Sequence, residues 1–190
     1  MHFEGHCMEL TLGTSDELNR FLAEVERRAF RMAYLATGSE DDALDVVQDG
    51  MLDFVRLYAT KPADEWRPLF HRVLQSRITD WHRRTAVRNR FRSWFASGSD
   101  SEDTPDPVEA FPDPRGETPA SELLNRELAE RLENGIRQLP LRQKQAFMLR
   151  SWEGLDVSQT AVAMKCSEGS VKTHYFRALN ALRNVLEEYR

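Results

Sequence analysis

The chain has 190 residues, of which 41% are hydrophobic and 30% are charged, and its formal net charge is −5. This length accommodates one ordinary domain or two small ones, and the composition is typical of a helical protein that folds in water. Every apolar run is short and interrupted by charge, which excludes a segment long enough to cross a bilayer, and residues 1–12 lack the features of a secretory signal.

The first half of the chain predicts three helices. Apolar residues recur at spacings of three and four over residues 18–36, and Gly38 ends this first helix. Ser39 predicts the N-cap of a second helix, because an acid follows it three residues later. After a break at 61–64 a third helix begins, in which Pro68 is tolerated near the start.

Charge is strongly segregated in the middle of the chain. Residues 66–95 hold eight arginines and one acid, a net of +7, whereas residues 97–119 hold seven acids and one base, a net of −6. The acidic segment also holds five prolines and little apolar content, so it cannot offset the entropy of ordering. We therefore expect an all-α chain with helical domains at 15–95 and 119–190, joined by a flexible acidic, Pro-rich linker at 96–118. The two domains should vary in relative placement. For the linker two interpretations stay open: it contacts and masks the basic segment, or it is only a spacer whose acids provide solubility.

The second half predicts four further helices. A stripe of leucine and isoleucine over residues 124–139 ends at Pro140, and a second helix over 142–152 is closed by Gly154. Two more helices follow over residues 156–164 and 167–186, separated by a very short turn.

The last two helices have the spacing of a helix-turn-helix. Ala161 is the small residue at the helix crossing, and the β-branched Val171 follows ten positions later. Val157 and Val162 are expected to complete the small core, and Ser167 is a suitable N-cap. A plain helical hairpin with a solvated polar face is the alternative. The predicted outward face, suited to the major groove and to phosphates, contains Ser170, Lys172, Thr173, His174, Phe176 and Arg177.

Three segments resemble parts of bacterial RNA polymerase sigma factors. Residues 42–49 are similar to the helix that grips the clamp coiled coil of the polymerase, and residues 79–84 to the end of the helix that reads the downstream promoter element. Residues 139–173 resemble the C-terminal promoter-reading domain. The order and spacing of these segments resemble the extracytoplasmic-function (ECF) group, which keeps only two domains.

Two residues depart from the pattern of that family. Ser76 stands where the family usually has Asn, which affects the expected detail of downstream recognition. Lys165 stands at the turn position that Gly usually holds, and must therefore adopt a left-handed backbone or shift the turn.

The resemblance implies a promoter-specificity subunit whose partners are core RNA polymerase and promoter DNA, with an anti-sigma factor as a further inhibitory partner. Asp45, Gln48 and Asp49 share one helix face, and acids with an amide suit a basic partner surface. The alternative for these three residues is an ordinary solvated acidic face. With the resemblance, we expect them to bind core polymerase.

The arginine-rich segment is interleaved with aromatic residues, as binding to opened DNA requires. Arginines attract phosphates, and aromatic rings stack on unpaired bases. Phe70 and Trp81 are expected in the core, whereas residues near the start of the third helix are expected to touch an extruded base. The predicted downstream set contains Tyr58, Lys61, Trp66, Arg67, Arg77, Arg83 and Arg84.

Candidate catalytic and metal-binding groups are sparse. The five histidines form no convincing set, and His2, His6 and Cys7 cluster only at the extreme N-terminus. Cys166 is far from Cys7 along the chain, which favours a reduced, cytoplasmic compartment. The sequence lacks a phosphate-cradling glycine loop and a nucleophile beside a base. We therefore expect no enzymatic activity, no metal site and no cofactor.

A conventional helix-turn-helix regulator is the alternative function. Residues 171–174 also resemble the recognition helix of LuxR-type regulators, whose N-terminal domain binds a different partner. The basic, aromatic segment at 66–95 favours the sigma factor, because a sensor domain has no need of it. A helical enzyme is a third class, which the missing catalytic residues disfavour.

Overall fold

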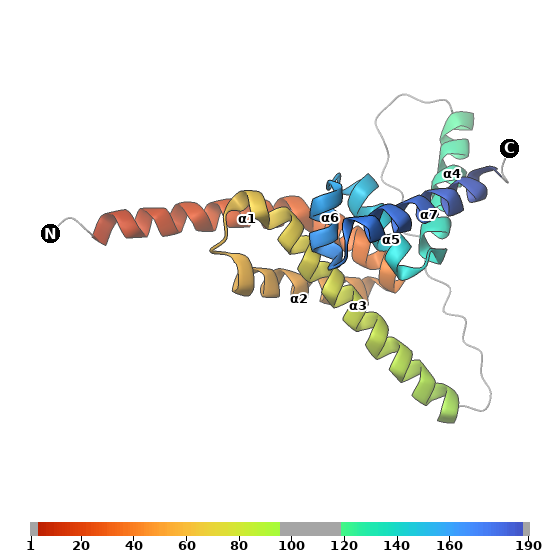
Figure 1. The fold of residues 1–190 in the computed structure, drawn as a ribbon, viewed down its shortest axis with the longest axis horizontal. Coiled ribbons are helices and arrows are strands. Elements are labelled where there is room, and N and C mark those ends of the chain that lie inside the picture. The colour runs from red at the N-terminus through yellow and green to blue at the C-terminus, as the bar shows by residue number, and fades with distance from the viewer. Residues whose placement is uncertain (1–3, 96–118, 188–190) are drawn as a thin grey trace.

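The computed structural model describes the backbone of residues 4–95 and 119–187, and the side chains of residues 15–88 and 126–187. Every regular element in these ranges is helical, as predicted, whereas the predicted linker at 96–118 lies outside them (Figure 1). No helix among the described residues is long and apolar enough to cross a membrane. The elements are α1 (Glu4–Thr37), α2 (Glu40–Tyr58), α3 (Ala63–Phe95), α4 (Pro119–Gln138), α5 (Leu141–Phe147), the π-helical turn η1 (Met148–Trp152), α6 (Val157–Met164) and α7 (Glu168–Glu187).

The boundary between α1 and α2 lies where the sequence predicts it. Gly38 has a φ of 75°, a left-handed conformation that suits glycine, and its N–H donates to the carbonyl of Tyr34 at 2.8 Å. Ser39 then caps α2, because its Oγ accepts a hydrogen bond from the N–H of Asp42 at 3.3 Å. These two residues reverse the chain so that α2 packs back against α1.

The core of α1, α2 and α3 is rich in aromatic rings. Phe54 and Phe70 are fully buried and meet edge to face, with ring centroids 5.7 Å apart. Phe21 of α1 packs against both rings. Phe70 therefore lies in the core as predicted, and the half-buried Trp81 packs against that core.

The helix predicted over 142–152 ends in a wider turn than expected. α5 passes into η1, where the N–H of Glu153 donates to the carbonyl of Met148, five residues earlier, at 3.0 Å. Gly154 follows with a φ of 67°, as predicted for the residue that closes this helix. Glu153 has a completely buried side chain directly after this turn.

The predicted helix-turn-helix is confirmed by α6 and α7. Val171 is buried and Ala161 packs against the core, as the ten-residue spacing requires. The predicted N-cap is also present, because the Oγ of Ser167 accepts from the N–H of Ser170 at 3.2 Å. Val162 is different: it is 43% exposed and not part of the small core, because it lies on the opposite side of α6 from the buried Thr160, Ala163 and Met164.

Lys165 occupies the left-handed conformation that its position in the turn requires. Its φ and ψ are 51° and 50°, and the next N–H, that of Cys166, donates to the carbonyl of Ala161 at 3.1 Å. Lys165 is the only residue other than glycine with a positive φ in the described part of the chain. A side chain in this conformation costs about 1–2 kcal/mol relative to the right-handed one.

The N-terminal helices (α1–α3) pack directly against the C-terminal helices (α4–α7). α6 lies along α3, and α4 contacts α1 (Figure 1). The last turns of α3 project away from both sets of helices. The sequence predicts that the two domains vary in relative placement, whereas the structure shows one specific arrangement of them. In this arrangement residues far apart in the sequence contact one another.

Lys165→Gly should stabilise the fold relative to Lys165→Met. Both substitutions remove the ammonium group, but only glycine relieves the left-handed strain of the folded backbone. Glycine also makes the unfolded chain more flexible, which opposes folding, so the net increase in the free energy of unfolding should be about 0.5–1 kcal/mol. At Lys172, inside α7, the same comparison should have the opposite sign, with glycine about 1 kcal/mol worse than methionine. Urea unfolding of the four variants measures both differences, and equal signs at the two positions would contradict the strain.

Candidate nucleic-acid interface

The outward face of α2 combines acids, an amide and exposed leucines. Asp45, Gln48 and Asp49 are all exposed and lie on one side of the helix, as predicted. Leu44 and Leu52 flank Gln48 at spacings of four, and they are 53% and 51% exposed. Exposed leucines beside acids are suited to a protein partner that offers both apolar and basic groups.

Sequence reasoning missed these leucines. Leu52 and Val55 fit the apolar pattern of α2, but both are exposed, whereas Val46, Val47 and Phe54 form its buried side. An amphipathic helix of this length needs only one apolar stripe to face the core. The additional apolar residues of α2 were the signal in the sequence for a second, exposed apolar surface.

A polar groove separates the acids of α2 from the arginines of α3. Its volume is about 450 Å³. Arg77 spans part of it, with Nη1 3.4 Å from Asp49 and a second, shorter bond to Asp53. The hydrogen bond with Asp53 raises the pKa of Arg77 more than burial lowers it. The groove is lined by Asp42, Asp45, Val46, Gln48, Asp49, Arg77, Trp81, Arg84, Thr85 and Arg88.

The four arginines of the predicted downstream set fall into two groups. Arg83 and Arg84 are exposed in the C-terminal half of α3, and Arg83 approaches Asp80 only at 3.9 Å. Arg67 and Arg77 instead form ion pairs with acids of α1 and α2. The first group is available to phosphates, whereas the second group already joins helices together.

Trp66, in the first turn of α3, is not exposed as the sequence predicts. Its side chain is only 2% exposed, and its Nε1 donates to the carbonyl of Lys61 at 2.8 Å. Its ring lies 5.6 Å from that of Phe21, so Trp66 belongs to the aromatic core and is not exposed to a base. Tyr58 is half-buried against Phe54, and Lys61 is exposed at the tip of the turn before α3.

The predicted outward face of α7 is largely exposed. Lys172, Thr173 and Arg177 face solvent, and Phe176 is 63% exposed. An exposed phenylalanine between polar residues suits the thymine methyl groups of a major groove, and the basic residues suit phosphates and guanine. These four residues therefore lie on the exposed side of α7.

Ser170 and His174 lie at the edge of this face and are half-buried. The Oγ of Ser170 lies 2.9 Å from that of Ser167, within the helix cap. Burial lowers the pKa of His174, and the positive charges of Arg142 and Arg177 lower it further. His174 is therefore mainly neutral at pH 7, which makes it a hydrogen-bonding group and not a phosphate-binding cation.

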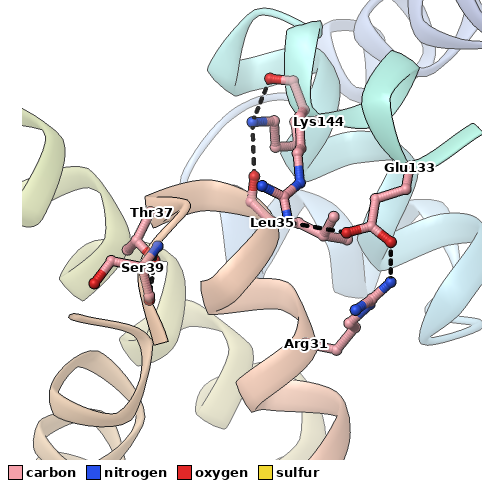
Figure 2. Close-up of polar contacts among 7 residues, drawn as sticks. Arg31, Leu35, Thr37, Ser39, Glu133 and Lys144 are labelled. Atoms are coloured by element: carbon pink, nitrogen blue, oxygen red, sulfur yellow. Dashed lines mark hydrogen bonds and ion pairs between the residues drawn. The ribbon is translucent and has the colours of Figure 1, made fainter. Parts of the chain in front are cut away.

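Lys144 of α5 connects the two sets of helices by hydrogen bonds. Figure 2 shows its ammonium group bonded on one side to the carbonyl of Leu35, in the last turn of α1. On the other side it donates to the carbonyl of Arg137, in the last turn of α4. Burial lowers the pKa of Lys144 to about 8, and the charge of Arg137 contributes. A cation at two helix C-termini satisfies carbonyls that lack partners in their own helices.

Among the described side chains, no group of three His, Cys, Asp or Glu residues is arranged to hold a metal ion. The N-terminal His2, His6 and Cys7 lie outside these side chains.

The chain is similar to RNA polymerase sigma factors by three comparisons. Residues 129–182 match the family described as Sigma-70, region 4. The RNA polymerase sigma-E factor of Streptomyces antibioticus is 30% identical over 60% of this chain and 61% of its own length. The ECF RNA polymerase sigma factor SigL of Mycobacterium tuberculosis is 29% identical over 84% of this chain and 82% of its own length.

The fold is also similar to a solved structure. The sigma factor RpoE of Bartonella quintana, solved with the anti-sigma factor NepR, has a TM-score of 0.61 and 20% sequence identity. The likeness covers 90% of this chain and 98% of RpoE. The relation in fold therefore extends over both sets of helices.

The stability of the chain should rise with pH between about 8 and 10.5 through Lys144. Because its folded pKa is about 8 and its ordinary value is 10.5, the unfolded chain holds more protons in this window. This contribution is complete above pH 10.5 and is lost as the pH falls through 8. Lys144→Met removes this titration. From pH 7.5 to pH 10 the unfolding free energy of the parent should therefore increase relative to that of the variant. If urea unfolding shows a constant difference in unfolding free energy between the two proteins across this range, the lowered pKa of Lys144 is wrong.

Proposed function

We propose that this chain is an RNA polymerase sigma factor of the extracytoplasmic-function group, which directs core RNA polymerase to specific promoters and assists strand opening there. The observation that carries this proposal is the similarity to a SigL protein along 84% of the chain. Sigma factors are not enzymes, so the free energy for strand opening comes from binding. The polymerase acts in the cytoplasm, which is therefore the proposed location.

We propose three functional segments. Residues 15–95 bind core polymerase and the downstream promoter element, residues 96–118 connect the domains, and residues 119–190 read the upstream promoter element. A LuxR-type regulator, the alternative, is disfavoured because the similarity to sigma factors includes the N-terminal half. An anti-sigma factor is a further proposed partner, by likeness to the RpoE that was solved with NepR.

The core-binding surface is proposed on the outward face of α2. Asp45, Gln48 and Asp49 offer acids and a directional amide, and the exposed Leu44 and Leu52 lie beside them. This combination supports a partner helix with basic and apolar residues, because the leucines gain from burial while the acids orient the partner.

The DNA-binding surfaces are proposed on α3 and α7. Downstream, Arg83 and Arg84 hold phosphates, and Lys61 with Tyr58 lies near an extruded base. Trp66 supports that turn from the core, while Arg67 and Arg77 position α3 through their ion pairs. Upstream, we propose contacts through Ser170, Lys172, Thr173, His174, Phe176 and Arg177.

Run-off transcription with purified core polymerase tests the assignment. Adding this chain should produce specific transcripts, and adding the double variant Asp45→Lys with Gln48→Ala should not. The reason is that a positive charge replaces an acid at a surface proposed to meet a basic partner, which should weaken co-purification with core at least tenfold. Circular dichroism checks that the variant keeps its helicity.

Glu26→Lys is the matched control, since Glu26 is an exposed acid on α1 with the same change of charge. It should bind core polymerase and transcribe like the parent. Full binding by the double variant would overturn the proposed surface on α2, and an absence of specific transcripts with the parent would overturn the function itself.

Arg177→Ala should weaken recognition of the upstream element. If the guanidinium contacts a base edge, the loss should be about 1–3 kcal/mol and specificity should relax at one base pair. A loss that is equal across sequences would assign Arg177 to a phosphate. Arg183→Ala, an exposed arginine near the end of α7, is the control and should have little effect. Binding of promoter variants by the holoenzyme measures both, and equal behaviour of the two variants would contradict the proposed orientation of α7.

A further inference from the structure

Two arginines of α1 meet acids of the C-terminal half of the chain. Arg31 forms an ion pair with Glu133 of α4 (Figure 2), and Arg28 approaches the buried carboxylate of Glu153 at 4.0 Å. A guanidinium stays charged at every ordinary pH, so it needs an acid or another acceptor where it loses part of its water. Each of these two arginines therefore has a counter-charge within the protein.

Arg72 of α3 lies at the same boundary without an acid. It is half-buried, and it forms no ion pair with any described side chain. It faces an open cleft of about 460 Å³ between α3 and α6, and two of the residues that line this cleft are cations while none is an acid. The cleft is lined by Arg72, Ser158, Ala161, Val162, Lys165 and Cys166.

The groups beside the cleft do not cancel its positive charge. The ammonium of Lys165 donates to the Oγ of Ser76 at 3.0 Å, a contact with a neutral hydroxyl that leaves the charge uncompensated. Burial raises the pKa of the Cys166 thiol, and the charge of Arg142 opposes this rise. The thiol is therefore mainly neutral at pH 7, and Arg142 adds a further positive charge near it. An anion in the cleft would be attracted from both sides.

The groove between α2 and α3 shows the opposite balance of charge. Its volume is similar, about 450 Å³, but its walls combine three arginines of α3 with three aspartates of α2. Arg77 is already paired with two aspartates of α2. The cations of that groove therefore face acids of the protein itself, whereas the cations of the cleft between α3 and α6 do not.

The wall that α6 contributes to the cleft is partly apolar. Val162 is 43% exposed, although the sequence predicts it in the small core of the helix-turn-helix, and it lines the cleft together with Ala161. Ser158, one turn earlier on α6, adds a hydroxyl. A volume of this size is within the range of about 300–1,000 Å³ that small-molecule sites occupy. The cleft therefore suits a small molecule that has both an anionic and an apolar part.

We propose that the cleft between α3 and α6 binds a small organic phosphate, with Arg72 and Lys165 attracting the phosphate group and Ala161 and Val162 packing against an apolar or aromatic group of the same molecule. A guanidinium can bind two phosphate oxygens at once, and an ammonium has three donors, of which Ser76 takes one. The residues that line the cleft are not part of the surfaces proposed for polymerase or DNA, so the site does not depend on the proposed function.

Alkylation of Cys166 by two reagents tests the charge of the cleft. In a Cys7→Ser background Cys166 is the only thiol of the chain. Iodoacetate is an anion and iodoacetamide is neutral, so the ratio of their rates reports the local potential, while the pKa of the thiol affects both rates alike. This ratio should be about threefold or more above that of N-acetylcysteine amide, and salt should lower it. Arg72→Met and Lys165→Met should each lower the ratio, whereas Arg183→Met, at an exposed position of α7, should not.

Phenyl phosphate is the probe for the ligand. At constant ionic strength, millimolar phenyl phosphate should slow the alkylation of Cys166 by iodoacetamide about threefold or more, because a fragment of this size binds in the millimolar range. Inorganic phosphate should protect Cys166 less, because it lacks the ring, and the neutral benzyl alcohol should not protect it. Arg72→Met should remove the protection. Val162→Ser should reduce the protection by phenyl phosphate to that given by inorganic phosphate.

Phosphorus NMR gives a second measurement that does not depend on the thiol. The parent chain should broaden the signal of phenyl phosphate, Arg72→Met should not, and Arg72→Lys should restore part of the effect because it keeps the charge. Circular dichroism checks that each variant keeps its helicity. The proposal is overturned if the alkylation ratio equals that of the free thiol, or if phenyl phosphate gives neither protection nor broadening. Equal protection by inorganic phosphate and phenyl phosphate would also overturn it, because the cleft would then attract any anion.

Discussion

The packing of α6 along α3 joins the N-terminal helices to the C-terminal helices. α3 buries its aromatic side against α1 and α2, pairs Arg77 with acids of α2, and gives a third side to the C-terminal helices. One helix therefore carries the N-terminal core, the charges proposed for DNA and the contact between the two halves. Because these sides belong to one helix, the C-terminal helices cover Ser76 and Thr79 while Arg83 and Arg84 remain exposed.

The distribution of charge along the sequence says more about the structure than the net charge of −5 does. The segment 66–95 carries a net charge of +7, yet Arg67 and Arg77 are neutralised within the fold by acids of α1 and α2. Arg83 and Arg84 stay exposed, and Arg84 lines the groove that faces the acids of α2. The positive field proposed for phosphates is thus concentrated toward the C-terminal end of α3, where the helix projects from the rest of the protein.

Local signals determine most of what the sequence could predict. Gly38, Ser39 and Gly154 each end or begin a helix through their own backbone or side-chain chemistry, and each lies where it was expected. The outward face of α7 followed from helical periodicity in the same way. Trp66 was misplaced because an aromatic residue among arginines fits both a core and a base-stacking surface. Only its contact with Phe21, from another helix, distinguishes the two.

The contact between Ser76 and Lys165 could not be predicted, although both residues stood out in the sequence. Each was recognised as a departure by itself, and a contact over 89 residues depends on how the two sets of helices dock. The cost of Lys165 is local, since its backbone is strained whether or not α6 lies on α3. Its benefit exists only when the halves are together. A residue with a fixed cost and a conditional benefit stabilises the docking of the two sets of helices, without making the isolated helix-turn-helix more stable.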